Sequence, residues 1–148
     1  MSAENKALVR RLYEEVLNNR RIELADELLS RSHAIRNNHL PDSGIGPDAY
    51  KREVARFIRA FPDLRFTIED LIAEQDTVVA CWTISGTHKG EFRDISPTGK
   101  TVPIEGITIH NIANGKIMDS YVTWDEFGVR QQLGVAPALN QPKRASAR

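Results

Sequence analysis

Hydrophobic residues recur at helical spacing through the first sixty positions of the chain. Apolar side chains three and four residues apart predict a first amphipathic helix, and they are Leu8, Val9, Leu12, Tyr13, Val16 and Leu17. A second, short helix is predicted from Ile22, Leu24, Leu28 and Leu29. A third is predicted to begin at Pro47, because proline fits the first helical position, where its missing N–H costs nothing. Pro62 ends this third helix.

The spacing changes from helical to alternating after residue 64. Leu64, Phe66 and Ile68 alternate with polar residues, a pattern typical of a half-buried strand. Three longer runs predict further strands, at residues 77–92, 101–113 and 116–124. The Asn- and Gly-containing segment between the second and third helices predicts a short strand and a loop.

Two local signals complete the predicted sheet. Asn114–Gly115 predicts a hairpin between the last two strands, and Asp125 predicts the N-cap of a closing helix. The order of elements predicts an α+β fold, in which three N-terminal helices pack on a strongly curved, mostly antiparallel sheet and a short C-terminal helix follows. Such a sheet forms a cone, which leaves a cavity for a small ligand.

Length and composition narrow the class of protein. The 148 residues predict a single domain over residues 1–138, followed by a polar tail at 139–148. Twenty basic and twenty acidic residues balance, so charge gives no reason to expect a nucleic acid or a membrane as partner. The sequence has no apolar signal core and no run long enough to span a membrane, so we expect a cytoplasmic location. The lone Cys81 excludes an internal disulfide.

Several segments between residues 5 and 135 resemble those of a known family. They are FPDLRFTIEDLIAEQDTVVACWT, GTHKGEF, SPTGK, GITIHNIANGKI and DEFGVRQQLG. With helices first and long strands after, the chain resembles the SnoaL-like polyketide cyclase and ester cyclase family, within the nuclear-transport-factor-2-like superfamily of α+β cones. The resemblance implies the fold and a central cavity. It leaves the activity open, because the superfamily includes isomerases, cyclases, hydrolases, hydroxylases and non-catalytic binders.

The resemblance also implies where an acid/base residue would lie. In polyketide cyclases of this family, an aspartate on the last strand is the general acid/base for an intramolecular aldol closure. Counting from the GKI turn, the matching position here is Val122, and a histidine that assists from the preceding strand corresponds to Thr108. Neither replacement relays a proton at neutral pH, so the resemblance does not carry the aldol reaction itself to this chain.

The hairpin register decides which side chains face the cavity. A two-residue turn would pair Val122 with Ile107, whereas a three-residue loop with Gly115 in a bulge would pair it with Gly106. We choose the second register, because it gathers the family's pocket-facing positions on one face of the sheet. That face would carry Gly106, Thr108, His110, Met118, Ser120, Val122 and Trp124.

The opposite face of the same two strands is rich in apolar side chains. It would carry Ile107, Ile109, Asp119, Tyr121 and Thr123. An apolar outer face has to be covered. We therefore expect a homodimer in which two sheets pack against each other about a two-fold axis.

Two residues are the candidate catalytic groups. His39 matches a histidine found at this loop in ester-cyclase-like sequences, and its side chain would titrate near neutral pH. Asn37 would lie on the same side, where a His–Asn pair could polarise a carbonyl or orient a water. A loop histidine bonded to backbone remains the alternative. Asp125 could anchor His39, or it could only cap the helix that follows.

The remaining candidates are walls or positioning groups. Trp82 is interpreted either as core or as a flat cavity wall, and Trp124 would line the same space. Thr108, Ser120 and Asn37 would position a substrate. His88 and His110 are interpreted as structural residues, with a catalytic role as the alternative for each, and His110 would lie opposite Met118 near the rim. The four histidines lack zinc-site spacing, so no metal and no cofactor is expected.

These candidates favour a cofactor-independent enzyme. It would transfer a proton on a small, mostly apolar or aromatic molecule that contains a carbonyl group, in the manner of a cyclase, isomerase or lyase. A non-catalytic binding protein on the same cone is the first alternative, and Val122 favours it. A cofactor-free hydroxylase or epoxide-opening enzyme is the second.

Overall fold

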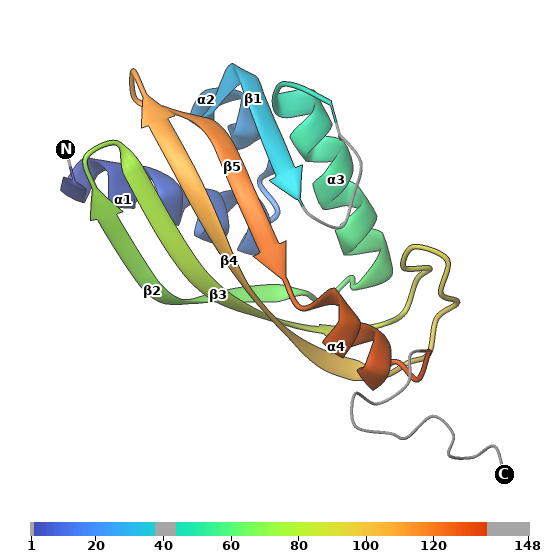
Figure 1. Ribbon diagram of the computed structural model, residues 1–148. Helices are drawn as coiled ribbons and strands as arrows, with labels where there is room; N and C mark the ends of the chain where they lie inside the picture. Colours follow the sequence, from blue (N-terminus) through green and yellow to red (C-terminus); the bar gives the residue numbers. More distant parts are fainter. Residues whose placement is uncertain (1, 38–43, 136–148) are drawn as a thin grey trace, which may run out of the picture.

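The computed structural model describes residues 2–37 and 44–135 (Figure 1). The helical elements are α1 (Ser2–Arg11), the π-helical η1 (Leu12–Asn18), the 3-10 turn η2 (Ile22–Leu24), α2 (Ala25–Leu28), α3 (Pro47–Ala60) and α4 (Glu126–Gln132). The strands are β1 (Leu29–Asn37), β2 (Arg65–Glu74), β3 (Thr77–Thr87), β4 (Thr101–Ala113) and β5 (Lys116–Trp124). Among the described residues, no helix is long and apolar enough to cross a membrane.

The five strands form one open sheet in the order β1-β5-β4-β3-β2. β1 runs parallel to β5, and every other pair is antiparallel. The N-terminal helices lie behind one face of the sheet and α3 runs beside β1 (Figure 1). The predicted α+β fold is confirmed. The predicted tail at 139–148 lies outside the described residues.

The first predicted helix changes character halfway along. The α-helix gives way at Leu12 to seven residues of π-helix, whose wider turn ends at Asn18. The side-chain amide of Asn18 pairs with both backbone groups of Phe66, with Nδ2 3.0 Å from the carbonyl oxygen and Oδ1 2.7 Å from the amide nitrogen. This pairing ties the π-helix to the edge strand β2. π-helical turns are frequent at functional sites. The segment that carries Tyr13 is therefore a candidate part of such a site.

The β4–β5 hairpin has a two-residue turn with Ala113 paired to Lys116, so the three-residue loop that we predicted is wrong. Asn114 (φ 54°) and Gly115 (φ 72°) form a two-residue turn in which both residues take positive φ, as a type I′ turn requires. The pairing then shifts by one residue around Met118, between the Ile112–Ile117 and Asn111–Asp119 pairs. This irregularity is a β-bulge, in which one strand carries an extra residue.

The bulge has a direct effect on the pocket face. Val122 pairs with Thr108, neither with Ile107 nor with Gly106 as predicted. Thr108 lies two residues from Gly106, so the predicted face is still correct from Ser120 to Trp124. Met118 does not share that face, because it is the extra residue of the bulge.

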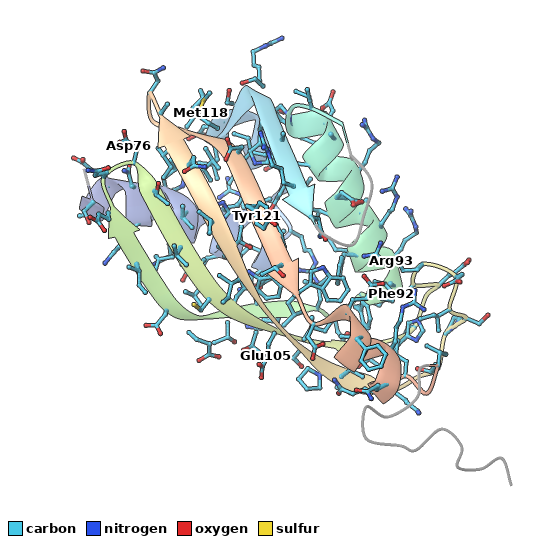
Figure 2. The ribbon with its side chains drawn as sticks, in the orientation of Figure 1. Asp76, Phe92, Arg93, Glu105, Met118 and Tyr121 are labelled. Carbon is cyan, nitrogen blue, oxygen red and sulfur yellow. The ribbon has the colours of Figure 1, made fainter. Side chains whose placement is uncertain are left out.

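The outer face of the sheet carries several large apolar side chains that are solvent-exposed in a single chain. Its exposed large side chains are Ile72, Ile107, Ile109 and Tyr121. Cys81 pairs with Ile107 and is half-buried, so it is not the fully enclosed thiol that an apolar run usually contains. Figure 2 labels Tyr121 on β5.

Candidate active site

A cavity of about 540 Å³ lies between the helices and the inner face of the sheet. This volume is within the range of small-molecule sites. Most of its wall is apolar or aromatic, and its lining includes Leu12, Leu17, Ile35, Tyr50, Val54, Phe57, Phe66, Trp82, Ile84, Phe92, Val122 and Trp124.

Trp82 is part of this wall, and Gly106 makes its position possible. A Cβ at Gly106 would lie 2.3 Å from the Trp82 ring, so only glycine lets the indole lie against β4. The indole Nε1 donates to Thr108 Oγ1 at 2.9 Å, and the ring meets Phe66 edge-on at 5.3 Å. Gly106 is not among the residues that line this cavity, and its predicted place in the substrate pocket stays a prediction.

A chain of four polar side chains forms one end of the cavity region. Tyr13 Oη lies 3.0 Å from His110 Nε2, and His110 Nδ1 lies 2.8 Å from Ser120 Oγ. Ser120 Oγ also lies 3.0 Å from His33 Nε2. Each of the four residues is at most 3% exposed. Tyr13, His110 and Ser120 line the cavity itself.

Burial keeps this chain uncharged at neutral pH. Burial, and to a smaller extent the nearby His33 as a potential like charge, lower the pKa of His110 to about 3. Burial also lowers the pKa of His33 to about 4, although the Asp119 carboxylate opposes the shift. The pKa of Tyr13 is raised, again mainly by burial. The chain therefore consists of neutral donors and acceptors.

Five charged residues also line the cavity, and most of them are exposed to solvent. They are Glu53, Arg56, Arg59, Glu91 and Arg93. The Arg93 guanidinium lies 5.2 Å from the Phe92 ring centre and 5.7 Å from that of Trp124, and its Nε is 3.6 Å from Glu126 Oε2. Figure 2 shows Phe92 and Arg93 together, close to α4.

Most of the predicted pocket residues meet at this cavity. Asn37, Trp82, Thr108, Ser120, Val122 and Trp124 all line it. Their contact with a substrate stays a prediction.

The two predicted catalytic residues are His39 and Asp125. His39 lies outside the described residues. Asp125 is the N-cap of α4, where its Oδ1 accepts from the Gly128 N–H at 2.9 Å, and it does not line the cavity. The predicted capping role is confirmed, and a catalytic role for either residue stays a prediction.

Sequence reasoning missed the importance of His110, His33 and Tyr13. His110 was predicted opposite Met118 at the rim, but the bulge places it opposite Ser120 in the buried chain. His88 has the predicted structural role: it is fully buried, and its Nδ1 accepts from the Thr98 N–H at 3.1 Å.

The low pKa values of His33 and His110 predict acid-sensitive stability. Both groups are neutral in the fold, whereas the unfolded chain binds protons below the ordinary histidine pKa of about 6.5. The stabilisation is therefore complete above that pH and is lost as pH falls toward about 4 and then about 3. We expect the free energy of unfolding in urea to fall by at least about 3 kcal/mol between pH 7 and pH 4.

The matching control for this prediction is His110→Gln, which removes one of the two titrating groups. Its unfolding free energy should depend less steeply on pH than that of the wild type. Equal stability of the wild-type protein at pH 7 and pH 4 would contradict the assignment of two neutral buried histidines.

A family model and solved structures match this chain. The family model for SnoaL-like polyketide cyclase matches residues 7–133. A search of curated proteins finds no match.

Among the described residues, no three His, Cys, Asp or Glu side chains gather as a metal site would require.

Solved structures share the fold over nearly the whole chain. A proposed SnoaL-like polyketide cyclase from Jannaschia sp. CCS1 has a TM-score of 0.84 at 21% identity, covering 93% of this chain and 95% of its own. AclR, a proposed hydroxylase from Streptomyces galilaeus, has a TM-score of 0.82 at 22% identity, covering 95% of this chain and 87% of its own.

A third neighbour is more similar in sequence. It is a proposed polyketide cyclase from Acidithiobacillus ferrooxidans, with a TM-score of 0.80 at 28% identity, and the match covers 90% of this chain and 96% of its own. Since the family model spans most of the sequence, the chain belongs to the SnoaL-like polyketide cyclase family.

Proposed function

We propose that this protein is a cofactor-independent enzyme that moves a proton at the carbon next to a carbonyl group of a small, mostly apolar molecule. One observation carries the proposal: a hydrogen-bonded chain of neutral imidazole and hydroxyl groups opens onto an aromatic cavity. A buried chain of this kind is costly unless every member is satisfied. Its position at the cavity is what acid–base chemistry on a bound ligand needs.

Each part of the site has a role in this reaction. The aromatic wall would bind the body of the substrate, and the Tyr13 hydroxyl would donate to its carbonyl oxygen. When the Tyr13 proton turns to the substrate, the Nε2 lone pair of His110 becomes available. His110 would then take the proton from carbon while the C–H electron pair forms the carbon–carbon double bond of an enolate.

Val122 explains why the base would come from elsewhere. This position holds the aspartate acid/base in polyketide cyclases that the sequence resembles, and valine has no proton to exchange. His110 lies on the neighbouring strand, two residues from Thr108, which pairs with Val122. Thr108 and Asn37 would position the carbonyl.

The test uses 2-tetralone, a bicyclic ketone with acidic protons beside its carbonyl. Proton NMR in D₂O would follow the exchange of these protons for deuterium, with isothermal titration calorimetry to measure binding. The proposal predicts exchange well above the buffer rate, saturating with ketone concentration. Ketone binding in the cavity without faster exchange would contradict it.

That contrary outcome would support a non-catalytic binding protein. The observation that favours this second candidate is the low pKa of His110, which makes its imidazole a weak base. The cavity and its aromatic wall suit binding as well as catalysis.

We further propose that the protein is a homodimer through its outer sheet face. Ile107 is 43% exposed and Ile109 38%, side by side with Tyr121 on the neighbouring strand. A charge there would have to be buried without a partner, so Ile107→Lys should convert a dimer into a monomer. Light scattering after size-exclusion chromatography would measure the mass.

Ile45→Lys is the matched control for the dimer, because Ile45 is equally apolar and more exposed but lies beside the edge strand β1, where it forms an isolated bridge with Ala34, two strands away from β4. It should leave the mass unchanged. A monomeric wild-type protein at tens of micromolar would contradict the dimer.

A further inference from the structure

We propose that Ser120 passes the substrate's proton from His110 to His33, so that His33 holds it between proton removal and its return. This inference rests on the proposed function, and it concerns a residue that does not line the cavity. His33 would be a positioning and proton-storing residue that acts through Ser120, while His110 touches the substrate.

The geometry of Ser120 is the first argument. Its Oγ lies 2.8 Å from His110 Nδ1 and 3.0 Å from His33 Nε2. A hydroxyl has one proton, so it donates to one imidazole and accepts from the other. The tautomers of the two histidines are therefore coupled: if one ring presents an N–H to Ser120, the other presents a lone pair.

Two departures from regular strand pairing create this arrangement. The bulge at Met118 turns Ser120 toward His110, and a register shift in β1 between Leu29 and Ala34 brings His33 beside β5. Ile35 pairs with Ser120 in the parallel ladder. Bulges re-aim side chains and are common beside active sites, which favours a functional over an incidental contact.

The proton moves along the chain in three linked transfers. Before reaction, His110 carries its proton on Nδ1 and donates to Ser120, which donates to His33 Nε2. When Nε2 of His110 takes the proton from carbon, the Nδ1 proton moves to Ser120 Oγ and the Ser120 proton moves to His33 Nε2. His33 becomes an imidazolium, and the substrate becomes an enolate whose oxygen accepts from Tyr13. The reverse sequence returns one proton to the product.

Electrostatics favours His33 over His110 as the place where the charge rests. The titratable groups around His33 are Asp119 on β5, His110 on β4 and Tyr50 on α3, whose ring packs edge-on at 5.8 Å. Only Asp119 among them carries a negative charge at neutral pH, and it stabilises a cation on His33. Moving the charge away from His110 would offset the weak basicity of that buried imidazole.

The test measures kcat and KM for 2-tetralone exchange in Ser120→Ala, His33→Gln and the double variant. Each single variant should lower kcat roughly ten-fold and leave KM within about two-fold. The double variant should be no slower than either single one, because the chain is broken once in all three. Ser120→Thr keeps the hydroxyl and should restore most of the rate.

Other outcomes separate this inference from the proposed function. A wild-type kcat in Ser120→Ala and His33→Gln, with exchange that still depends on His110, would exclude proton storage on His33. The proposed function would remain. Multiplied losses in the double variant would also exclude proton storage on His33, since they indicate independent roles. If the alanine variant does not fold, which circular dichroism would show, Ser120→Thr and His33→Gln decide the question. The absence of exchange in the wild type would overturn the proposed function itself.

Discussion

The His110→Gln variant is expected to exchange the protons of 2-tetralone at least about 100-fold more slowly than the wild type. Glutamine can still form a hydrogen bond to Tyr13 or Ser120, which lie 3.0 and 2.8 Å from the histidine nitrogens. Its amide cannot accept a proton at neutral pH, so the chain loses its base and keeps much of its packing. Calorimetry should show ketone affinity within about three-fold of the wild type, because the apolar wall supplies most of the binding.

Two control variants make this result specific. His88→Gln removes an equally buried histidine that bonds to Thr98 and does not line the cavity. Asp125→Ala removes the α4 cap, at a cost of about 1 kcal/mol in stability. Both should exchange the ketone at the wild-type rate. A slow Asp125→Ala variant would revive the predicted catalytic aspartate, and a wild-type rate in His110→Gln would exclude His110 as the base.

The Gly106→Ala variant is expected to lose both stability and ligand binding. The new methyl carbon would lie 2.3 Å from Trp82 and 2.9 Å from the Thr123 carbonyl oxygen, so the indole has to move into the cavity. That movement breaks the Trp82–Thr108 hydrogen bond in a buried site. We expect a loss of about 1–3 kcal/mol in urea unfolding, typical of overpacking, and a ketone affinity at least about ten-fold weaker.

Thr123→Ala is the matched control, because Thr123 lies on the outer face of the paired strand and pairs with Ile107. It should leave the ketone affinity unchanged. A Gly106→Ala protein that binds 2-tetralone as tightly as the wild type would show that Trp82 does not define the cavity wall.

The secondary structure was largely predictable because strong local signals agree with the fold. Pro47 begins α3, Asn114–Gly115 forms the turn of the hairpin, and Asp125 caps α4. Each of these acts through backbone conformation or an adjacent hydrogen bond, so its effect can be read from neighbouring residues.

The site was less predictable because it depends on contacts distant in sequence. The bulge at Met118 has no sequence signature as clear as Asn–Gly. The predicted register, which lacks this bulge, places His110 opposite Met118 near the rim, whereas His110 in fact pairs with Ser120. His33 and Ser120 are 87 residues apart and meet only through the parallel pairing of β1 with β5. Tyr13 belongs to an ordinary apolar stripe, and only the π-helix and the facing His110 distinguish it.

The placement of the indole rings gives this protein a built-in optical reporter. The sequence has two tryptophans, and both Trp82 and Trp124 line the same cavity. All of the tryptophan fluorescence of this protein therefore comes from residues of the cavity wall. A molecule that enters the cavity will change the emission colour or intensity without any attached dye, so libraries of unlabelled compounds can be screened for occupants directly in solution.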